Sequence, residues 1–95
     1  MDDMQPTMIE FSNGDKIWFL NGKIHRTDGP AVVRTDGINI WYLNGDLHRT
    51  DGPSVDRPDA VTRFHLYGCA YTFDEWIGRS SLTDEEKVMM KLQYG

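Results

Sequence analysis

The sequence lacks most features of secreted and membrane proteins. Cys69 is the only cysteine, so no internal disulfide can form, and we expect a reducing compartment, the cytoplasm. No stretch approaches the roughly 20 apolar residues that span a bilayer. Residues 1–12 also have neither the basic nor the apolar segment of a secretory signal. The sequence therefore predicts an intracellular protein with no membrane partner.

Positive charge is scarce as well. The 95 residues include 10 Lys and Arg against 15 Asp and Glu, which gives an acidic chain with a formal net charge of -5. Proteins that bind duplex nucleic acid need clustered positive charge. We therefore expect no binding to duplex nucleic acid.

Motifs that carry enzyme chemistry are missing too. The sequence has no glycine-rich nucleotide-binding motif and no nucleophile elbow. Cys69 lies in an apolar stretch, where we expect a packed and inert thiol. His25, His48 and His65 are too far apart in sequence to form a local chelating pair. The sequence thus predicts no enzyme, no metal site and no cofactor.

What the sequence does contain is an internal repeat. Residues 18–32 and 41–55 are identical at 11 of 15 positions, with an offset of 23 residues. A third, diverged copy follows, in which Phe64 and Gly68 occupy the positions of the repeated Trp and Gly. A fixed period of this length is typical of proteins built from stacked repeats.

Each copy predicts a short antiparallel hairpin. Residues 38–43 are rich in β-branched and aromatic side chains. Asn44-Gly45 then supplies the two positive-φ positions of a type I′ turn. The segment Thr50–Pro53 ends the returning strand, because proline cannot donate to a ladder. The spacing of such turns leaves room for strands of about four to six residues.

The C-terminal part predicts two helices. The segments Thr72–Glu75 and Thr83–Glu86 both match the capping box, in which a Thr and a Glu satisfy the first backbone N–H groups of a helix. We expect a short helix near residues 73–78 and a longer one near residues 83–94.

These helices are expected to cover the last hairpin and hide its edge. Trp76 of the shorter helix is expected in the core. Val88, Met89 and Leu92 share one face at helical spacing, and we expect the longer helix to pack through that face.

The predicted fold is a single domain over residues 1–95, mainly β and α+β overall. Tandem 23-residue β-hairpin repeats (about 9–31, 32–54 and a degenerate 55–71) would form a meandering sheet, and helices at about 72–95 would cap it.

The repeated motif W-[FY]-L-N-G-x-[IL]-H-R-T-D-G-P-[AS] resembles a family of small tandem-repeat proteins found mostly in bacteriophages and some bacteria. The tail matches in kind, with Tyr71-x-Phe-x-Glu-Trp76 followed by Leu82–Val88. The period and the aromatic-x-x-Asn-Gly core are more loosely similar to MORN-type repeats, which are β-hairpin interaction surfaces. The resemblance implies a hairpin fold, a bacteriophage origin and a place in the host cytoplasm. By association with other small phage proteins, it also implies inhibition of host defence.

Polar and aromatic residues that recur in register are the candidate binding residues. The repeated His lies near an Asp, and a His–Asp pair allows acid–base chemistry, but a residue that recurs once per repeat usually serves the repeat. The repeated His and Arg would then stabilise the fold through hydrogen bonds to neighbouring turn carbonyls or to Asp. Rows of arginines suit phosphates or carboxylates, and rows of tryptophans suit bases. Alternatively, the aromatic row is core and the arginines pair with aspartates. The candidates are His25, Arg26, Arg34, His48, Arg49, Arg57, Trp18 and Trp41.

Two functions remain open on the sequence alone. The first is a protein-binding module that inhibits or adapts a host protein, such as a defence component. The second is a sponge that sequesters a small anionic ligand, such as a signalling nucleotide. Residues 9–11 are also expected to lie on an exposed sheet edge, which favours a homodimer.

Overall fold

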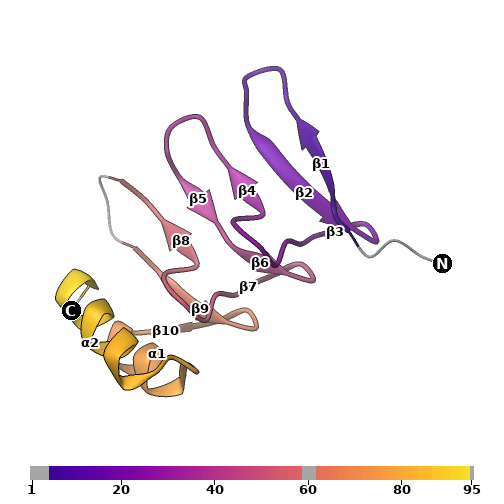
Figure 1. Ribbon diagram of the computed structural model, residues 1–95. Coiled ribbons are helices and arrows are strands. Elements are labelled where there is room, and N and C mark those ends of the chain that lie inside the picture. Colours follow the sequence, from indigo (N-terminus) through magenta and orange to yellow (C-terminus); the bar gives the residue numbers. More distant parts are fainter. Residues whose placement is uncertain (1–4, 59–61, 95) are drawn as a thin grey trace.

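The computed structural model describes residues 5–58 and 62–94 (Figure 1). Over these residues the protein is mainly β, with antiparallel strands followed by two C-terminal helices, which confirms the predicted fold class. The strands are β1 (Thr7–Glu10), β2 (Lys16–Leu20), β3 (Lys23–Ile24), β4 (Val32–Val33), β5 (Asn39–Ile40), β6 (Tyr42–Leu43), β7 (Asp46–Leu47), β8 (Val55–Asp56), β9 (Phe64–Leu66) and β10 (Cys69–Tyr71), and the helices are α1 (Phe73–Arg79) and α2 (Asp84–Tyr94).

The strands divide into one larger sheet and a row of hairpins (Figure 1). The larger sheet has the order β1-β2-β4-β5-β8, and β3 also pairs with β2, whereas β6 pairs with β7 and β9 with β10. Most strands have only two or three residues, fewer than the four to six expected. The strand expected over residues 38–43 is interrupted at Trp41. The Trp41 N–H donates to the carbonyl of Ser54, next to the larger sheet, whereas the Trp41 carbonyl accepts the N–H of His48 in the hairpin. The chain therefore passes from the larger sheet into the hairpin at Trp41.

The tips of the hairpins have the predicted turn geometry. Asn44 and Gly45 have φ values of 51° and 86°, and Asn21 and Gly22 have 53° and 78°. The third tip keeps this conformation with Tyr67 in place of Asn, at φ 50°. Asn tolerates the left-handed region better than a bulky residue does. The conformation of the third tip therefore depends on contacts outside the turn.

Backbone hydrogen bonds join each hairpin to the next. At the first junction Gly45 donates to the carbonyl of Ile24 (2.8 Å), and Arg26 donates to that of Tyr42 (3.2 Å). The bonds of the second junction, 23 residues later, are Gly68 to Leu47 (2.8 Å) and Arg49 to His65 (3.2 Å). The row of hairpins is thus continuous through its main chain, although the individual strands are very short.

The main cluster of buried side chains lies at the C-terminal end of the molecule, while Ala31 and Val32 are buried in the repeats. Phe64, Trp76 and Ile77 are its buried members. Trp76 is fully buried, as expected. The partly buried side chains packed against this cluster are Leu66, Tyr71, Phe73, Leu82, Met90 and Tyr94. The two helices therefore cover the last hairpin, in line with the predicted cap (Figure 1).

Local signals at the helix starts act as predicted. Thr72 and Glu75 form a reciprocal capping box at α1. At α2, the Thr83 N–H donates to the Glu86 carboxylate (2.9 Å), and the Glu86 N–H donates to the Thr83 hydroxyl (3.2 Å). Neither helix is long and apolar enough to cross a membrane, in the part of the chain that the structure describes.

The face through which α2 packs differs from the expectation. Val88, Met89 and Leu92 are exposed, whereas Met90 and Tyr94 of the opposite face contact the core. The Tyr94 ring makes an edge-type contact with Phe64 and a tilted contact with Phe73, at centroid distances of 5.7 and 6.4 Å. These aromatic contacts fix the rotation of α2, and the prediction from helical spacing was wrong.

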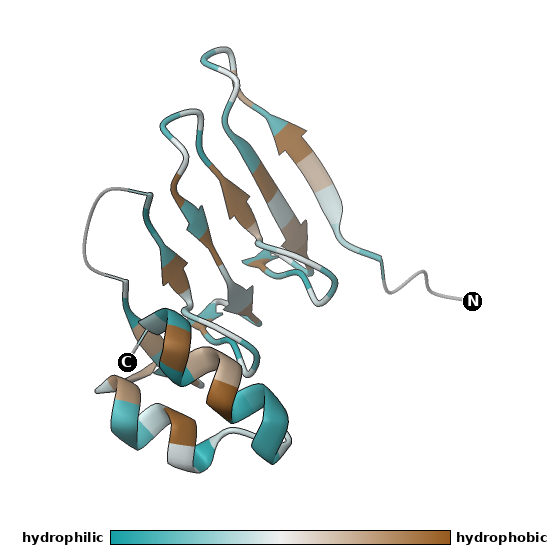
Figure 2. Ribbon diagram, turned by 60° about the vertical axis from the view of Figure 1, so that its left-hand side comes forward, coloured by the Kyte–Doolittle hydropathy of each residue, from teal (hydrophilic) through white to brown (hydrophobic). Residues whose placement is uncertain are grey.

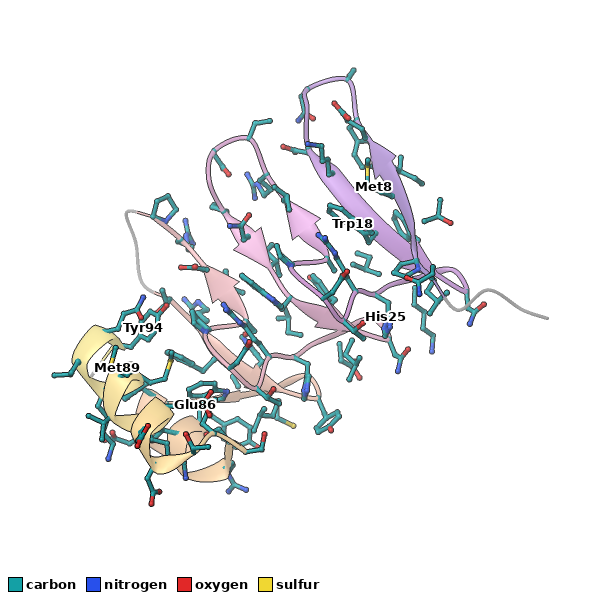
Figure 3. All side chains as sticks on the ribbon, viewed as in Figure 1. Met8, Trp18, His25, Glu86, Met89 and Tyr94 are labelled. Carbon is teal, nitrogen blue, oxygen red and sulfur yellow. The ribbon has the colours of Figure 1, made fainter. Side chains whose placement is uncertain are left out.

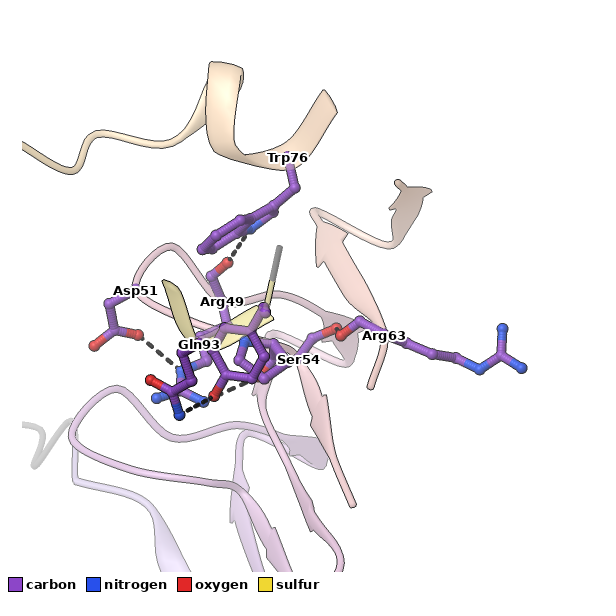
Figure 4. A network of polar contacts seen from close by, with 8 residues as sticks. Arg49, Asp51, Ser54, Arg63, Trp76 and Gln93 are labelled. Carbon is purple, nitrogen blue, oxygen red and sulfur yellow. Dashed lines mark hydrogen bonds and ion pairs between the residues drawn. The ribbon is translucent and has the colours of Figure 1, made fainter. Parts of the chain in front are cut away.

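We predict that Trp76→Phe destabilises the fold. Its indole N–H donates to the carbonyl of Arg49 (2.9 Å), which ties α1 to the second repeat (Figure 4). Phe fills most of the space but leaves that carbonyl without its donor, so we expect a loss of about 1–3 kcal/mol in the free energy of unfolding.

Urea denaturation followed by circular dichroism measures this loss. Leu92→Ala, at an exposed position of α2, is the control and should change stability by no more than about 0.5 kcal/mol. Equal stability of Trp76→Phe and the wild type would show that the Arg49 bond contributes nothing.

Candidate functional site

Arg49 is held by several contacts within its own repeat, and Figure 4 shows the one with Asp51. Its Nε donates to Asp51 (2.8 Å), its Nη1 donates to the carbonyl of Pro53 (3.1 Å), and its guanidinium lies over the Trp41 ring, 3.7 Å from the centroid. A Cβ atom at Gly52 would lie 2.6 Å from the guanidinium carbon of Arg49, so any larger residue there would displace the guanidinium from this position. The Thr-Asp-Gly-Pro segment therefore forms a socket for the arginine.

The first copy has the same arrangement. Arg26 donates from Nε to Asp28 (2.9 Å) and from Nη1 to the carbonyl of Pro30 (3.1 Å), and its guanidinium lies 3.9 Å from the centroid of the Trp18 ring. Cation–π contacts and hydrogen bonds of this kind stabilise a loop when they are shielded from water. Four candidate residues, Arg26, Arg49, Trp18 and Trp41, thus have defined contacts inside the fold.

The two repeated histidines link neighbouring hairpins. His25 is buried, and its Nδ1 accepts the backbone N–H of Asn44 at 2.9 Å. His48 accepts the backbone N–H of Tyr67 in the same way, also at 2.9 Å. The repeat predicted that its His and Arg bond turn carbonyls or Asp. The arginines make such bonds, whereas the histidines accept a backbone N–H instead. The partner is the turn of the next copy, 19 residues further on.

These bonds require a histidine that carries no proton on Nδ1. A protonated ring donates from both nitrogens and cannot accept the N–H. Burial holds the pKa of His48 below its ordinary value of 6.5. Burial also lowers the pKa of His65, with a smaller effect from the nearby Arg63 guanidinium. His25 and His48 are thus part of the hairpin stack, and burial favours the neutral form of His48 and His65.

The remaining candidates, Arg34 and Arg57, are exposed and lie apart from the arginine sockets. Arg34 forms an ion pair with Asp36, with 3.0 Å between Nη2 and Oδ2. Arg57 makes no hydrogen bond or ion pair with another described residue. The structure therefore does not bring the four arginines together into one row of free guanidiniums.

A cleft lies between the two Thr-Asp-Gly-Pro loops and collects four of the candidates. Its volume is about 550 Å³, and its lining residues are Arg26, Thr27, Asp28, Gly29, Trp41, Leu43, His48, Arg49, Thr50 and Asp51. This volume is within the range of small-molecule sites. The two arginines are balanced by two aspartates, however, so the cleft has no strong excess of positive charge.

A groove of about 630 Å³ lies on the apolar face of the larger sheet. Its residues are Phe11, Ser12, Asn13, Asp15, Ile17, Val32, Arg34, Ile40 and Tyr42. The floor of this groove is apolar because residues that pair directly across neighbouring strands lie on the same face of a sheet. The paired row runs Ile9, Ile17, Val32, Ile40 and Val55 across β1, β2, β4, β5 and β8.

Most of the large exposed apolar side chains lie at the two ends of the molecule. Exposure of residues 9–11 was expected from the sequence, whereas the exposed apolar face of the last helix was not. Met8, Ile9 and Phe11 lie at or next to β1, at the N-terminal end. Val88, Met89 and Leu92 lie on α2, at the other end, where Figure 2 shows apolar bands on the helix and Figure 3 labels Met8 and Met89. A helical wheel could have separated the two apolar faces of α2, but it could not choose which one packs.

Cys69 corrects one further expectation. Its side chain is exposed on β10 rather than packed. Over residues 5–58 and 62–94, no group of three His, Cys, Asp or Glu side chains could hold a metal ion. No family model, no curated protein and no solved structure matches this chain.

We predict that the fold loses stability as the pH falls from about 7.5 to 5.5. His48 and His65 have lowered pKa values in the folded protein, so the unfolded chain binds protons more readily. Their contribution is complete above the unfolded value of 6.5 and is lost as the pH falls through the lower folded values.

Urea midpoints at several pH values test this prediction. His48→Asn keeps an acceptor near the position of Nδ1 but does not titrate, so its midpoint should fall less than that of the wild type. An identical pH dependence in both proteins would exclude His48 as a contributor.

Proposed function

We propose that the chain is a protein-binding module that contacts its partner through the outer face of α2. The observation that carries this proposal is the exposure of Val88, Met89 and Leu92, at 56%, 63% and 78%. A solvent-exposed apolar stripe on a helix is a common docking element, since it fits an apolar groove on a partner.

The chemistry of the helix defines the partner. Asp84, Glu85 and Glu86 form the first turn of α2 and lie next to the apolar stripe. A complementary surface has an apolar groove with basic residues at the end that receives this turn. Helix α1 and the last hairpin hold α2 in place through Met90 and Tyr94, so the stripe is presented on a rigid support.

The resemblance to small phage repeat proteins suggests the biological setting. In that setting the partner is a host protein, for example a defence component, and the module inhibits or adapts it in the host cytoplasm. The engagement of the repeated His and Arg side chains within the fold supports a binding role rather than an enzymatic one.

We predict that Val88→Ser combined with Leu92→Ser abolishes partner binding without unfolding the protein. Both positions are exposed, and such surface changes usually alter stability by no more than about 0.5 kcal/mol. The measurement is a tagged pull-down from bacterial host lysate, with mass spectrometry of proteins retained in stoichiometric amounts.

Lys91→Ala is the matched control, because Lys91 is exposed on the same helix but is not apolar. A partner retained by the wild type and by Lys91→Ala, and lost with the double variant, supports the proposal. Equal retention by all three proteins, or no retained protein at all, contradicts it.

A sponge for a small anionic ligand is the second candidate function, favoured by the cleft between the repeat loops. Arg26 and Arg49 both line this cleft beside Trp41, and a guanidinium next to an aromatic ring suits a phosphate attached to a base. Asp28 and Asp51 oppose it, because they already bind the two arginines.

We predict that, if this second function holds, Thr50→Asp weakens ligand binding at least tenfold. Thr50 is exposed and lines the cleft, so a new carboxylate there repels an anion. Calorimetry with a panel of nucleotides measures binding, and Arg34→Ala, outside the cleft, is the control. Absence of heat with every nucleotide would remove this candidate.

A further inference from the structure

Among residues 5–58 and 62–94, no strand pairs with the outer edge of β1. It is the outermost strand of the larger sheet and pairs with β2 on its inner side (Figures 1 and 3). Met8 faces Trp18 across this pair. The Trp18 N–H, however, donates to the carbonyl of Ala31, and the Trp18 carbonyl accepts the N–H of His25. Both partners lie on the side of β2 that faces away from β1. The backbone groups of Met8 therefore point away from β2.

In an extended strand the backbone N–H and carbonyl groups of successive residues point to alternate sides, which gives their direction at the other positions of β1. Phe11 donates its N–H to Asp15, so residues 7, 9 and 11 direct their backbone groups inward, and residues 8 and 10 direct theirs outward. The outer edge thus offers one N–H and one carbonyl from Met8, and one of each from Glu10. All four residues of β1 are exposed, and with Phe11 they carry three of the large exposed apolar side chains.

We infer that two copies of this chain pair through β1, antiparallel and centred on Ile9. In this register Met8 of each copy lies opposite Glu10 of the other. Each of the two N–H groups and two carbonyls on either edge then meets a partner, which gives four hydrogen bonds. Pairing centred on Met8 is less favourable, because it places Glu10 opposite Pro6, which has no N–H.

The side chains suit the same register. Ile9 lies opposite Ile9 of the second copy. A two-fold axis normal to the sheet keeps the same face exposed on both copies, so the apolar row from Ile9 to Val55 continues from one sheet into the other. Glu10 lies opposite Met8 in this arrangement, so no like charges face one another directly.

This interface is separate from the proposed partner surface. It uses β1 at one end of the molecule, whereas the proposed function uses α2 at the other end (Figure 1). Variants of β1 therefore test self-association without changing α2, and either proposal can fail alone.

Disulfide trapping tests the register. In a Cys69→Ser background, Ile9→Cys should form a covalent dimer under mild oxidation, because directly opposed Cβ atoms lie about 4.5–5.5 Å apart. Met8→Cys is the matched control, since its closest counterpart lies at a diagonal distance of about 7–8 Å, too far for a disulfide. Covalent dimers with Met8→Cys but not with Ile9→Cys would overturn the inference.

Analytical ultracentrifugation tests the association itself. The wild type and Met8→Ala should have twice the chain mass of 11.0 kDa. Met8→Pro removes one outward N–H, and Ile9→Lys opposes two like charges, so both should have the mass of the single chain. Circular dichroism checks that both variants fold. A monomeric wild type, an open-ended aggregate or a dimer that survives both variants contradicts the inference.

Discussion

The whole row of hairpins depends on backbone N–H groups that each turn offers to the preceding hairpin. The left-handed conformation of Asn44 and Gly45 directs their N–H groups to His25 Nδ1 and to the carbonyl of Ile24. A two-stranded hairpin with strands this short is at best marginally stable in water. The hydrogen bonds between hairpins therefore stabilise a conformation that no hairpin keeps alone. The bond from Asn44 to His25 forms only when Nδ1 of the histidine carries no proton.

A second contact explains why the copies share so many residues. The arginine after each histidine closes the following loop by bonding the Asp and the Pro carbonyl, while its guanidinium covers the Trp that begins the copy. Trp, Arg, Asp, Gly and Pro thus act as one unit. A change at one position leaves the others without a contact, so selection for stability is enough to keep the set together in both copies.

Signals that act within a few residues were predictable from the sequence, and contacts between distant segments were not. The Asn-Gly turns and the capping box at Thr72 are local, and both are present as expected. The rotation of α2 depends on where the rings of Phe64 and Phe73 lie, which periodicity cannot show. The role of His25 was missed for the same reason, because its partner Asn44 belongs to the next copy.

The two ends of the larger sheet are physically different, and this limits how the molecule can assemble. Beyond β8, Arg63 bridges to Val55, and the last hairpin is packed beneath α1 and α2. At the other end β1 has backbone groups that no described residue bonds. Repeats that presented a free edge at both ends could add copies without limit. With one end covered, pairing through β1 is isologous and closes at two copies, which leaves α2 of each copy available at the outer ends.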